Sequence, residues 1–444
     1  MSTLFHPYLC RYIVADWLIK MFKQSRFNSS VIIGGKIIVY NSMTKAFLHI
    51  KNEYAIEQVV CDINSGDCEA YAHKSLIDNG FIVEAEKDEL AELKYIFNKG
   101  YFNDDTLSIA LMPSMACNFA CPYCFEEPYR DSKINPAYFP TLKKYAEKNF
   151  RYYNHVDVNM FGGEPLLFFE EMQNYLEYVA ELSQKYCFAY SCSIITNGSL
   201  LTNHIMEALK LHKCNSMQIT IDGCKRTHDQ TRNFRDGRPS FDHLLSIINN
   251  VVGPYLHEMG MNFTLRFNLL NNSIEEVKDS LLLVEPQYRD KISVFFRNVY
   301  DTSCFEGNNS NSVNDYSDLL AFAEAQGFKI MYNQYFARSC EACSDANFGY
   351  ITSDLAFWKC LNAKDCKENF GKIGQILEDG TIRFDAARLV EWYTAANCFD
   401  NEKCLQCSQL PDCLGGCIAH SVANQGKCRV CSEFNLTSLP FLYI

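Results

Sequence analysis

Two kinds of hydrophobic pattern divide the chain. Between about residues 105 and 300, short apolar runs alternate with helical segments of roughly 10–17 residues. Strands alternating with helices build parallel βα units, so this part predicts an α/β fold containing a partial (β/α)6 barrel, with chemistry at the carboxyl ends of its strands. The apolar runs expected to form the strands are Leu107–Met112, Val156–Phe161, Tyr190–Ile195, Met217–Ile221, Phe263–Leu269 and Ile292–Phe296.

The first 104 residues follow another pattern. Val31–Ile33 and Lys36–Tyr40 flank two glycines as the strands of a hairpin would, and Ala46–Ile50 would add a third strand. A helix, a second helix, a short strand and a third helix are expected at about 53–62, 67–79, 81–83 and 88–98. A small sheet with short helices predicts a winged-helix-like α+β module that recognises a peptide. A plain N-terminal cap on the next domain is the alternative.

The remaining chain lacks long periodic elements. Residues 301–315 are polar and rich in asparagine, which indicates a linker or exposed loop. From about residue 335 onward cysteines crowd the sequence, so metal clusters are expected to organise this part. The predicted domains are therefore a module at 1–104, a barrel core at 105–300, a bridging region at 301–334 and a cysteine-rich domain at 335–444.

Charge and cysteine content narrow the function. The 444-residue chain has a formal net charge of −12, a poor match for nucleic acid, and no block of like charge indicates a membrane surface. The N-terminal stretch lacks the features of a signal peptide or a membrane span, so a cytoplasmic protein is expected. Its 22 cysteines therefore favour metal binding or redox chemistry over disulfides.

Three cysteines stand together in a loop directly after the first predicted strand of the barrel. Cys117, Cys121 and Cys124 form a CxxxCxxC motif with the aromatic Tyr123 before its last cysteine. This motif resembles that of the radical SAM superfamily. The resemblance implies that the three thiolates bind a [4Fe–4S] cluster whose fourth iron holds S-adenosylmethionine. A zinc knuckle that takes a distant fourth ligand is the alternative.

Later strand ends carry further motifs of the same family. Each is expected to contact S-adenosylmethionine: the turn after the second strand, the end of the third strand, and the "DG…HD..R" segment after the fourth, in which Arg232 would pair with the methionine carboxylate. Turn and capping roles are the alternative for Asp222 and His228. The residues expected to bind this cofactor, besides Tyr123, are Gly162, Gly163, Glu164, Pro165, Thr196, Asn197, Asp222 and Arg232.

The C-terminal cysteines resemble the SPASM domain of radical SAM enzymes that modify ribosomal peptides. The resemblance implies two auxiliary [4Fe–4S] clusters, and therefore three clusters in all. In this match Leu355 replaces a glycine of the family pattern. A second alignment of the pattern, through Cys366, Gly380 and Asp385, is possible. Structural zinc sites are the alternative to iron–sulfur clusters. One cluster would use Cys340, Cys343, Cys360 and Cys417, and the other Cys404, Cys407, Cys413 and either Cys428 or Cys431.

Together these motifs predict an oxidoreductase that matures a peptide. Its 5′-deoxyadenosyl radical would abstract hydrogen from a side-chain carbon of a ribosomally synthesised precursor, giving a carbon–carbon, ether or thioether crosslink. The expected partners are that precursor, bound through a leader segment, and a low-potential electron donor of the flavodoxin or ferredoxin type. An anaerobic sulfatase maturase is an alternative, although Leu361 stands where such enzymes carry an aspartate base after the cysteine matched by Cys360. A non-catalytic iron–sulfur or zinc scaffold is a third possibility.

Overall fold

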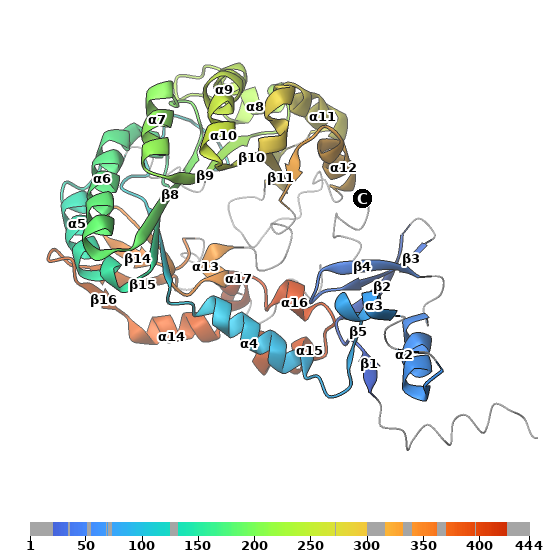
Figure 1. Cartoon of the computed structure of the whole chain (residues 1–444). Helices are drawn as coiled ribbons and strands as arrows, with labels where there is room; N and C mark the ends of the chain where they lie inside the picture. Colours follow the sequence, from blue (N-terminus) through green and yellow to red (C-terminus); the bar gives the residue numbers. More distant parts are fainter. Residues whose placement is uncertain are drawn as a thin grey trace, which may run out of the picture. The chain divides into compact units, whose positions relative to one another are not determined.

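The computed structural model divides the chain into two compact units, each described here by itself (Figure 1). Among the residues that the structure describes, unit 1 contains those up to 99 together with 397–415, and unit 2 contains 100–395 and 416–423. The described residues are 21–33, 36–50, 55–67, 69, 73–124, 132–270, 272–299, 316–331, 340–361, 370–395 and 397–423.

Unit 2 is built on an eleven-stranded sheet, counted over the described residues, with the order β12-β11-β10-β9-β8-β7-β6-β13-β14-β15-β16. Its strands from β6 to β12 pair in parallel, and all six strands expected from the sequence are confirmed. The short β12 follows them as a further parallel strand that was not expected. These strands are β6 (Thr106–Leu111), β7 (His155–Met160), β8 (Ala189–Thr196), β9 (Cys214–Ile221), β10 (Asn262–Leu269), β11 (Ile292–Asn298) and β12 (Lys329–Ile330).

Helices cover the outer face of this curved sheet (Figure 1). One side of each strand supplies buried apolar residues such as Val158, Ile219 and Phe267 to the core beneath the helices. The inner side of the same strands carries polar residues, which is the alternation that strand geometry imposes. The helices are α5 (Tyr138–Asn149), α6 (Phe169–Tyr186), α7 (Asn203–Leu211), α8 (Lys225–Thr231), α9 (Phe241–Ile247), α10 (Gly253–Met259), α11 (Ile274–Leu282) and α12 (Ser317–Ala325).

Sequence signals account for several helix ends. Ser273 and Glu276 form a capping box at the start of α11, and the Thr202 hydroxyl accepts from the backbone N–H of Ile205 at the start of α7. Helix α6 ends at Cys187 in the left-handed conformation. Local chemistry therefore fixes where these helices begin and end, and sheet burial fixes which face is inside.

Strands β13 to β16 continue the sheet beyond β6. β13 (Phe348–Ile351) runs parallel to β6, and β14 (Ala356–Trp358), β15 (Lys372–Ile376) and β16 (Ile382–Phe384) follow as antiparallel neighbours. β15 and β16 form a hairpin around Asp379 and Gly380, and helix α14 (Ala386–Thr394) follows it. The SPASM assignment of this region stays a prediction.

Unit 1 contains the predicted three-stranded antiparallel sheet, β2 (Asn28–Ile33), β3 (Lys36–Asn41) and β4 (Ala46–Ile50). The second helix was expected at about 67–79, and among the described residues it is α3, which spans Lys74–Asp78. The other elements are β1 (Phe22–Gln24), α2 (Ala55–Ser65), β5 (Ile82–Glu84) and α4 (Glu89–Tyr101). Whether this module is a winged helix stays a prediction.

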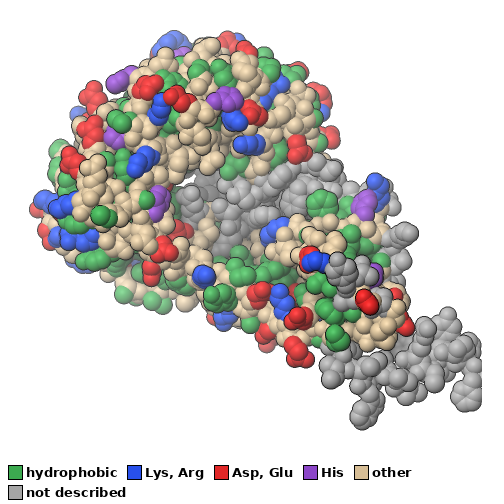
Figure 2. Space-filling view, in the orientation of Figure 1, with side chains coloured by type: hydrophobic (Ala, Val, Ile, Leu, Met, Phe, Trp, Pro, Cys, Tyr) green, Lys and Arg blue, Asp and Glu red, His purple; other side chains and the backbone are tan. Residues whose placement is uncertain are grey.

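Unit 1 also includes a stretch from the cysteine-rich end of the chain. The short helices η10 (Cys398–Asp400), α15 (Glu402–Leu405) and α16 (Leu410–Cys413) cluster with the N-terminal elements, although the sequence placed all of 335–444 in one domain. Basic and acidic side chains are interspersed on the face seen in Figure 2. None of the helices in the described ranges has the length and apolar character needed to cross a membrane.

Candidate functional site

The loop that carries Cys117, Cys121 and Cys124 follows β6 and is held by the glycine turn after β7. The backbone N–H of Gly163 donates to the carbonyl of Ser114 at 3.3 Å, and that of Glu164 donates to the carbonyl of Ala116 at 2.8 Å. A Cβ atom on Gly163 would lie 2.2 Å from the Met115 carbonyl oxygen, and one on Gly162 would lie 2.5 Å from that of Ser114. The two glycines therefore let the turn approach the cysteine loop, and Gly162 also needs its φ of 118°.

A second segment holds the other side of the same loop. The N–H of Ala120 donates to the carbonyl of Asn233, and the N–H of Arg235 donates to the carbonyl of Asn118, both at 2.9 Å. The side chain of Asn197, directly after β8, donates to the Asn118 side chain at 2.8 Å and lies 3.9 Å from the Cys117 sulfur. Segments after three neighbouring strands thus fix the cysteine loop.

The three thiols of this loop share one apolar cluster. Cys121 is buried there with Phe119 and Leu244, and the partly buried Cys117 and Cys124 pack against them. Burial raises the pKa of the Cys117 thiol to about 12, opposed chiefly by the N–H that Phe119 donates to its sulfur. This set of soft donors fits an iron–sulfur cluster, whose charge would favour the thiolates.

Glu164 links the glycine turn to the end of β8. Its two carboxylate oxygens accept from the N–H of Leu166 at 3.0 Å, the Thr196 hydroxyl at 2.7 Å and the N–H of Asn197 at 2.7 Å. Burial raises the pKa of this carboxyl, and these donors oppose the rise. Pro165 follows as the first residue of the short helix η5 (Pro165–Phe168), where its missing N–H costs nothing.

Tyr123 and Asp222 meet at the end of β9. The Tyr123 hydroxyl donates to Asp222 Oδ2 at 2.5 Å, and Arg232 Nη1 donates to the Tyr123 oxygen at 3.3 Å and lies 3.9 Å from the Cys121 sulfur. Thr231 and Asn268 also donate to the Asp222 carboxylate, at 2.8 and 3.1 Å. Arg232 Nε is buried with no hydrogen-bond partner among the described residues, so this guanidinium retains a donor for a bound anion.

His228 and Asp229 hold the segment that carries Arg232. His228 Nδ1 accepts from the N–H of Asp222 at 3.1 Å, and its Nε2 lies 2.9 Å from the Ser240 hydroxyl. Burial lowers the pKa of His228 to about 3, so the imidazole is neutral. Asp229 accepts from the N–H groups of Ser240 and Phe241. Both side chains thus stabilise the turn and the start of helix α9, which is the structural role given as the alternative for His228.

Comparison with known proteins identifies a domain in the middle of the chain. A family model described as the radical SAM superfamily matches residues 111–284, which contain the cysteine loop, the glycine turn and Arg232. Residues 111–284 therefore form a radical SAM domain. Such a domain implies a [4Fe–4S] cluster that binds S-adenosylmethionine, and the three gathered thiols fit it.

Two curated radical SAM relatives and one solved structure resemble the chain. The radical SAM cyclopropyl synthase TigE of Paramaledivibacter caminithermalis is 23% identical over 45% of this chain. A serine-type anaerobic sulfatase-maturating enzyme of Bacteroides thetaiotaomicron is 30% identical over 30% of it. The matches span 44% and 33% of those relatives' own lengths. The structure of anSMEcpe with bound AdoMet and Kp18Cys peptide has a TM-score of 0.55 at 18% identity, and the match covers 76% of this chain and 96% of that one.

Unit 2 gathers the first set of C-terminal cysteines. Hydrogen bonding with the thiols of Cys340 and Cys417, together with burial, raises the pKa of Cys343 well above its usual range. Cys343 and Cys360 are buried in one apolar cluster. Leu355, which replaces the expected glycine, has a φ of 63°, a conformation that glycine favours.

The described cysteines of the second set lie in unit 1, where the N-terminal module contacts the segment that carries them. The Tyr40 hydroxyl donates to Asp412 Oδ1 at 3.1 Å, and Lys45 forms an ion pair with the same oxygen next to Cys413. Cys404 and Cys413 are buried and Cys407 is exposed. Cys366, Cys428 and Cys431 lie outside the described residues, and Asp385 caps helix α14. In the described ranges, no group of three or more His, Cys, Asp or Glu side chains has the geometry to hold a single metal ion.

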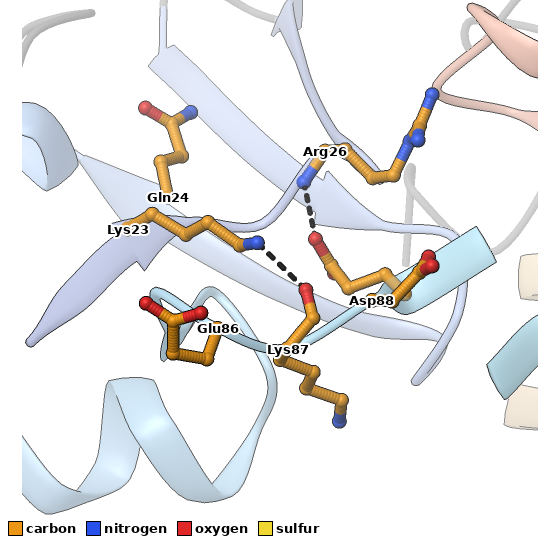
Figure 3. Close-up of a pocket in the computed structure, with 7 residues that line it drawn as sticks. Lys23, Gln24, Arg26, Glu86, Lys87 and Asp88 are labelled. Carbon is orange, nitrogen blue, oxygen red and sulfur yellow. Dashed lines mark hydrogen bonds between the residues drawn. The ribbon is translucent and has the colours of Figure 1, made fainter. Parts of the chain in front are cut away.

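A surface pocket in unit 1 does not involve any predicted site residue. Lys23, Gln24, Arg26 and residues 86–89 line it, and Lys23 donates to the carbonyl of Lys87 at 2.6 Å (Figure 3). Charges of both signs line this pocket. We assign it no role.

Several residues of the site escaped the sequence analysis. Asn118, Thr231 and Asn268 complete the networks around the cysteine loop and Asp222, but a lone Asn or Thr near a strand end carries no distinctive spacing. Asn268 was recoverable in principle, because it lies near the carboxyl end of a predicted strand on the polar side.

Proposed function

We propose that this chain is a radical SAM enzyme that matures a ribosomally synthesised precursor peptide by forming a crosslink between side chains. The observation that carries the proposal is the cysteine loop, which backbone hydrogen bonds hold beside Arg232, whose buried Nε has no hydrogen-bond partner within the described ranges. The superfamily match and the similarity to the cyclopropyl synthase TigE support a radical reaction.

Each residue of the site has a proposed task. Cys117, Cys121 and Cys124 would hold the iron–sulfur cluster, which with S-adenosylmethionine supplies the 5′-deoxyadenosyl radical. Arg232 would bind the methionine carboxylate, because its guanidinium lies 3.9 Å from the Cys121 sulfur and its buried Nε has no hydrogen-bond partner among the described residues. Tyr123 would orient Arg232 through the 3.3 Å hydrogen bond to its hydroxyl oxygen.

Residues of the glycine turn and of the strand end after β8 have supporting tasks. Gly162, Gly163 and Pro165 shape the turn that holds the cysteine loop. Glu164, with Thr196 and Asn197, would face the amino group and ribose of S-adenosylmethionine. The three hydrogen bonds that Glu164 accepts favour its ionised form, and they leave about one of the four lone-pair sites of the carboxylate for an ammonium group.

The C-terminal cysteines would bind two auxiliary [4Fe–4S] clusters that accept the electron released after hydrogen abstraction. The grouping of Cys340, Cys343, Cys360 and Cys417 in unit 2 and the left-handed Leu355 support the first ligand set. Cys404, Cys407 and Cys413, with Cys428 or Cys431, would hold the second. A flavodoxin- or ferredoxin-type protein would supply the electron that starts the reaction.

The small sheet of unit 1 would bind the leader segment of the precursor. Its strands β2 and β4 are the two edges of an antiparallel sheet, and an edge strand can pair with an extended peptide. Phe47 on β4 is 59% exposed, so a leader with an apolar side chain could cover it.

The proposal is tested by co-expressing the chain with short precursor candidates under anaerobic conditions and measuring peptide mass. Crosslinking removes two hydrogens per link. Conversion of a serine or cysteine to an aldehyde would instead indicate a sulfatase maturase, which the relative from Bacteroides thetaiotaomicron keeps as the second candidate. If the protein cleaved S-adenosylmethionine but left the mass of every candidate peptide unchanged, maturation of these peptides would be refuted.

A further inference from the structure

Lys359 in unit 2 is a lysine whose side chain is completely buried. Its exposed fraction is 0%, and its Nζ donates to three backbone carbonyls, those of Asp345 at 2.9 Å, Ala346 at 3.0 Å and Phe348 at 2.5 Å. Lysine is almost never fully buried unless its charge is compensated, because the removal of an ammonium group from water is costly. Three acceptors require three N–H donors, which only the ammonium form provides. Lys359 is therefore a buried positive charge.

This charge lies among the residues proposed to hold the first auxiliary cluster. Lys359 directly precedes Cys360 in the sequence, and the carbonyls that it binds belong to the segment that follows Cys343. Burial lowers the pKa of Lys359 to about 8. Negative charge on neighbouring groups opposes this fall, and these groups are the carboxyl of Asp345 and the thiols of Cys343, Cys340 and Cys360. The ammonium group is thus within electrostatic reach of three of the four candidate ligands.

The same hydrogen bonds join two segments that carry ligands of this cluster. They tie the residue after β14 to the segment from α13 (Glu341–Ser344) to the start of β13. Cys343 belongs to α13, and it shares a buried apolar cluster with Cys360. A purely structural brace at this position would need the hydrogen bonds of Lys359 but not its charge, and this difference can be measured.

The charge matters because reduction makes an iron–sulfur cluster more negative. Closure of a crosslink releases one electron and one proton from the substrate, the proton to solvent, and the proposed function gives the electron to an auxiliary cluster. A neighbouring cation stabilises the reduced cluster more than the oxidised one and so raises its reduction potential. The Asp345 carboxylate offsets part of this effect. It is present in both oxidation states, however, so removal of the Lys359 charge still lowers the potential.

We propose that Lys359 raises the reduction potential of the first auxiliary cluster, so that this cluster accepts the electron that leaves the substrate. The inference rests on the proposed function, because it requires a cluster held by Cys340, Cys343, Cys360 and Cys417. Since its side chain is fully buried, Lys359 acts through the cluster and not on the substrate. It is therefore a positioning residue.

Redox titration of the anaerobically reconstituted full-length chain, followed by electron paramagnetic resonance, tests this inference. Cys360→Ala identifies the signal of the first auxiliary cluster, because that signal should disappear in this variant. Lys359→Gln removes the charge but keeps two N–H donors for the carbonyls, whereas Lys359→Arg keeps the charge.

The expected size of the shift follows from the charge. At ~10 Å and an effective dielectric constant of about 20, one unit charge changes an equilibrium constant at least about tenfold. We therefore expect Lys359→Gln to lower the reduction potential by at least about 59 mV, which is the equivalent of tenfold for one electron. Lys359→Arg should lower it by less.

Lys185→Gln is the matched control, because Lys185 pairs with Glu147 at 2.6 Å on the surface of the same unit and its side chain is 57% exposed. This variant should keep the wild-type potential. An unchanged potential in Lys359→Gln, equal shifts in Lys359→Gln and Lys359→Arg, or equal loss of iron from both variants would overturn the inference and leave Lys359 as a brace. Wild-type iron content and signals in Cys360→Ala would instead refute the first auxiliary cluster itself, and with it that part of the proposed function.

Discussion

Gly163→Ala perturbs the cysteine loop by the addition of one methyl group. The new Cβ would lie 2.2 Å from the carbonyl oxygen of Met115 and 2.3 Å from that of Ala116, and both are backbone atoms that cannot rotate away. Ordinary contact begins near 3.4 Å, so turn and loop must separate by about 1 Å. Such overpacking costs about 1–3 kcal/mol.

The separation also weakens two hydrogen bonds of the turn. The N–H of Gly163 donates to Ser114 at 3.3 Å and that of Glu164 to Ala116 at 2.8 Å, and each such bond contributes about 0.5–1.5 kcal/mol. We therefore expect the variant to lose ~2–4 kcal/mol of stability locally, and Cys117 to move with the displaced backbone. After reconstitution, the Gly163→Ala variant should therefore bind less iron than the wild type and form little 5′-deoxyadenosine.

Iron bound per chain after anaerobic reconstitution, and 5′-deoxyadenosine formed after reduction, measure the effect. Gly100→Ala is the matched control, because a Cβ atom added at this helical residue would meet nothing within 4 Å. This change should stabilise the chain by about 0.5–1 kcal/mol and leave the iron content and the 5′-deoxyadenosine yield unchanged. Wild-type iron content and product in Gly163→Ala would refute the role of the turn as the support of the loop.

Three further predictions test other parts of the account. Tyr123→Phe removes a hydrogen bond to a buried carboxylate and a partner of Arg232, so affinity for S-adenosylmethionine measured by titration should fall about tenfold; unchanged affinity would separate Tyr123 from the cofactor site. Burial lowers the pKa of His228 to about 3 in the folded chain, whereas the unfolded imidazole has a pKa of 6.5. The free energy of unfolding should therefore be highest above pH 6.5 and fall by ~1.5 kcal/mol between pH 6.5 and 5, because only the unfolded chain takes up the proton there. His228→Gln should remove that part of the pH dependence of melting. Lys45→Ala leaves the Asp412 carboxylate buried without its cation and should destabilise unit 1 by ~1–3 kcal/mol, whereas the exposed Lys87→Ala should cost under ~0.5 kcal/mol; equal melting of the two variants would contradict the role of the buried pair.

Periodicity predicted much of unit 2. The strands from Leu107–Met112 to Ile292–Phe296 were predictable because each is an apolar run between helices, and burial on the sheet produces that pattern directly. The cysteine loop and the glycine turn were predictable because both are contiguous motifs. In contrast, the short β12 carries too few residues for a periodic signal.

Contacts between distant segments were not predictable. The sequence contains no sign that Tyr40 and Lys45 meet Asp412, because the separation along the chain exceeds any local pattern. Likewise, the glycines of the turn were expected to approach a ligand, whereas their Cβ positions lie against the cysteine loop.

Reductive cleavage of S-adenosylmethionine by wild-type protein and Cys124→Ala tests the central claim most directly. Anaerobically reconstituted and reduced wild-type protein should form 5′-deoxyadenosine, and Cys124→Ala should form none, because two thiolates cannot hold the cluster in place of three. Cys413→Ala serves as the comparison, since it should keep some cleavage but lose peptide product. A wild-type rate of cleavage in Cys124→Ala, or a wild-type protein that takes up zinc and no iron, would contradict the account.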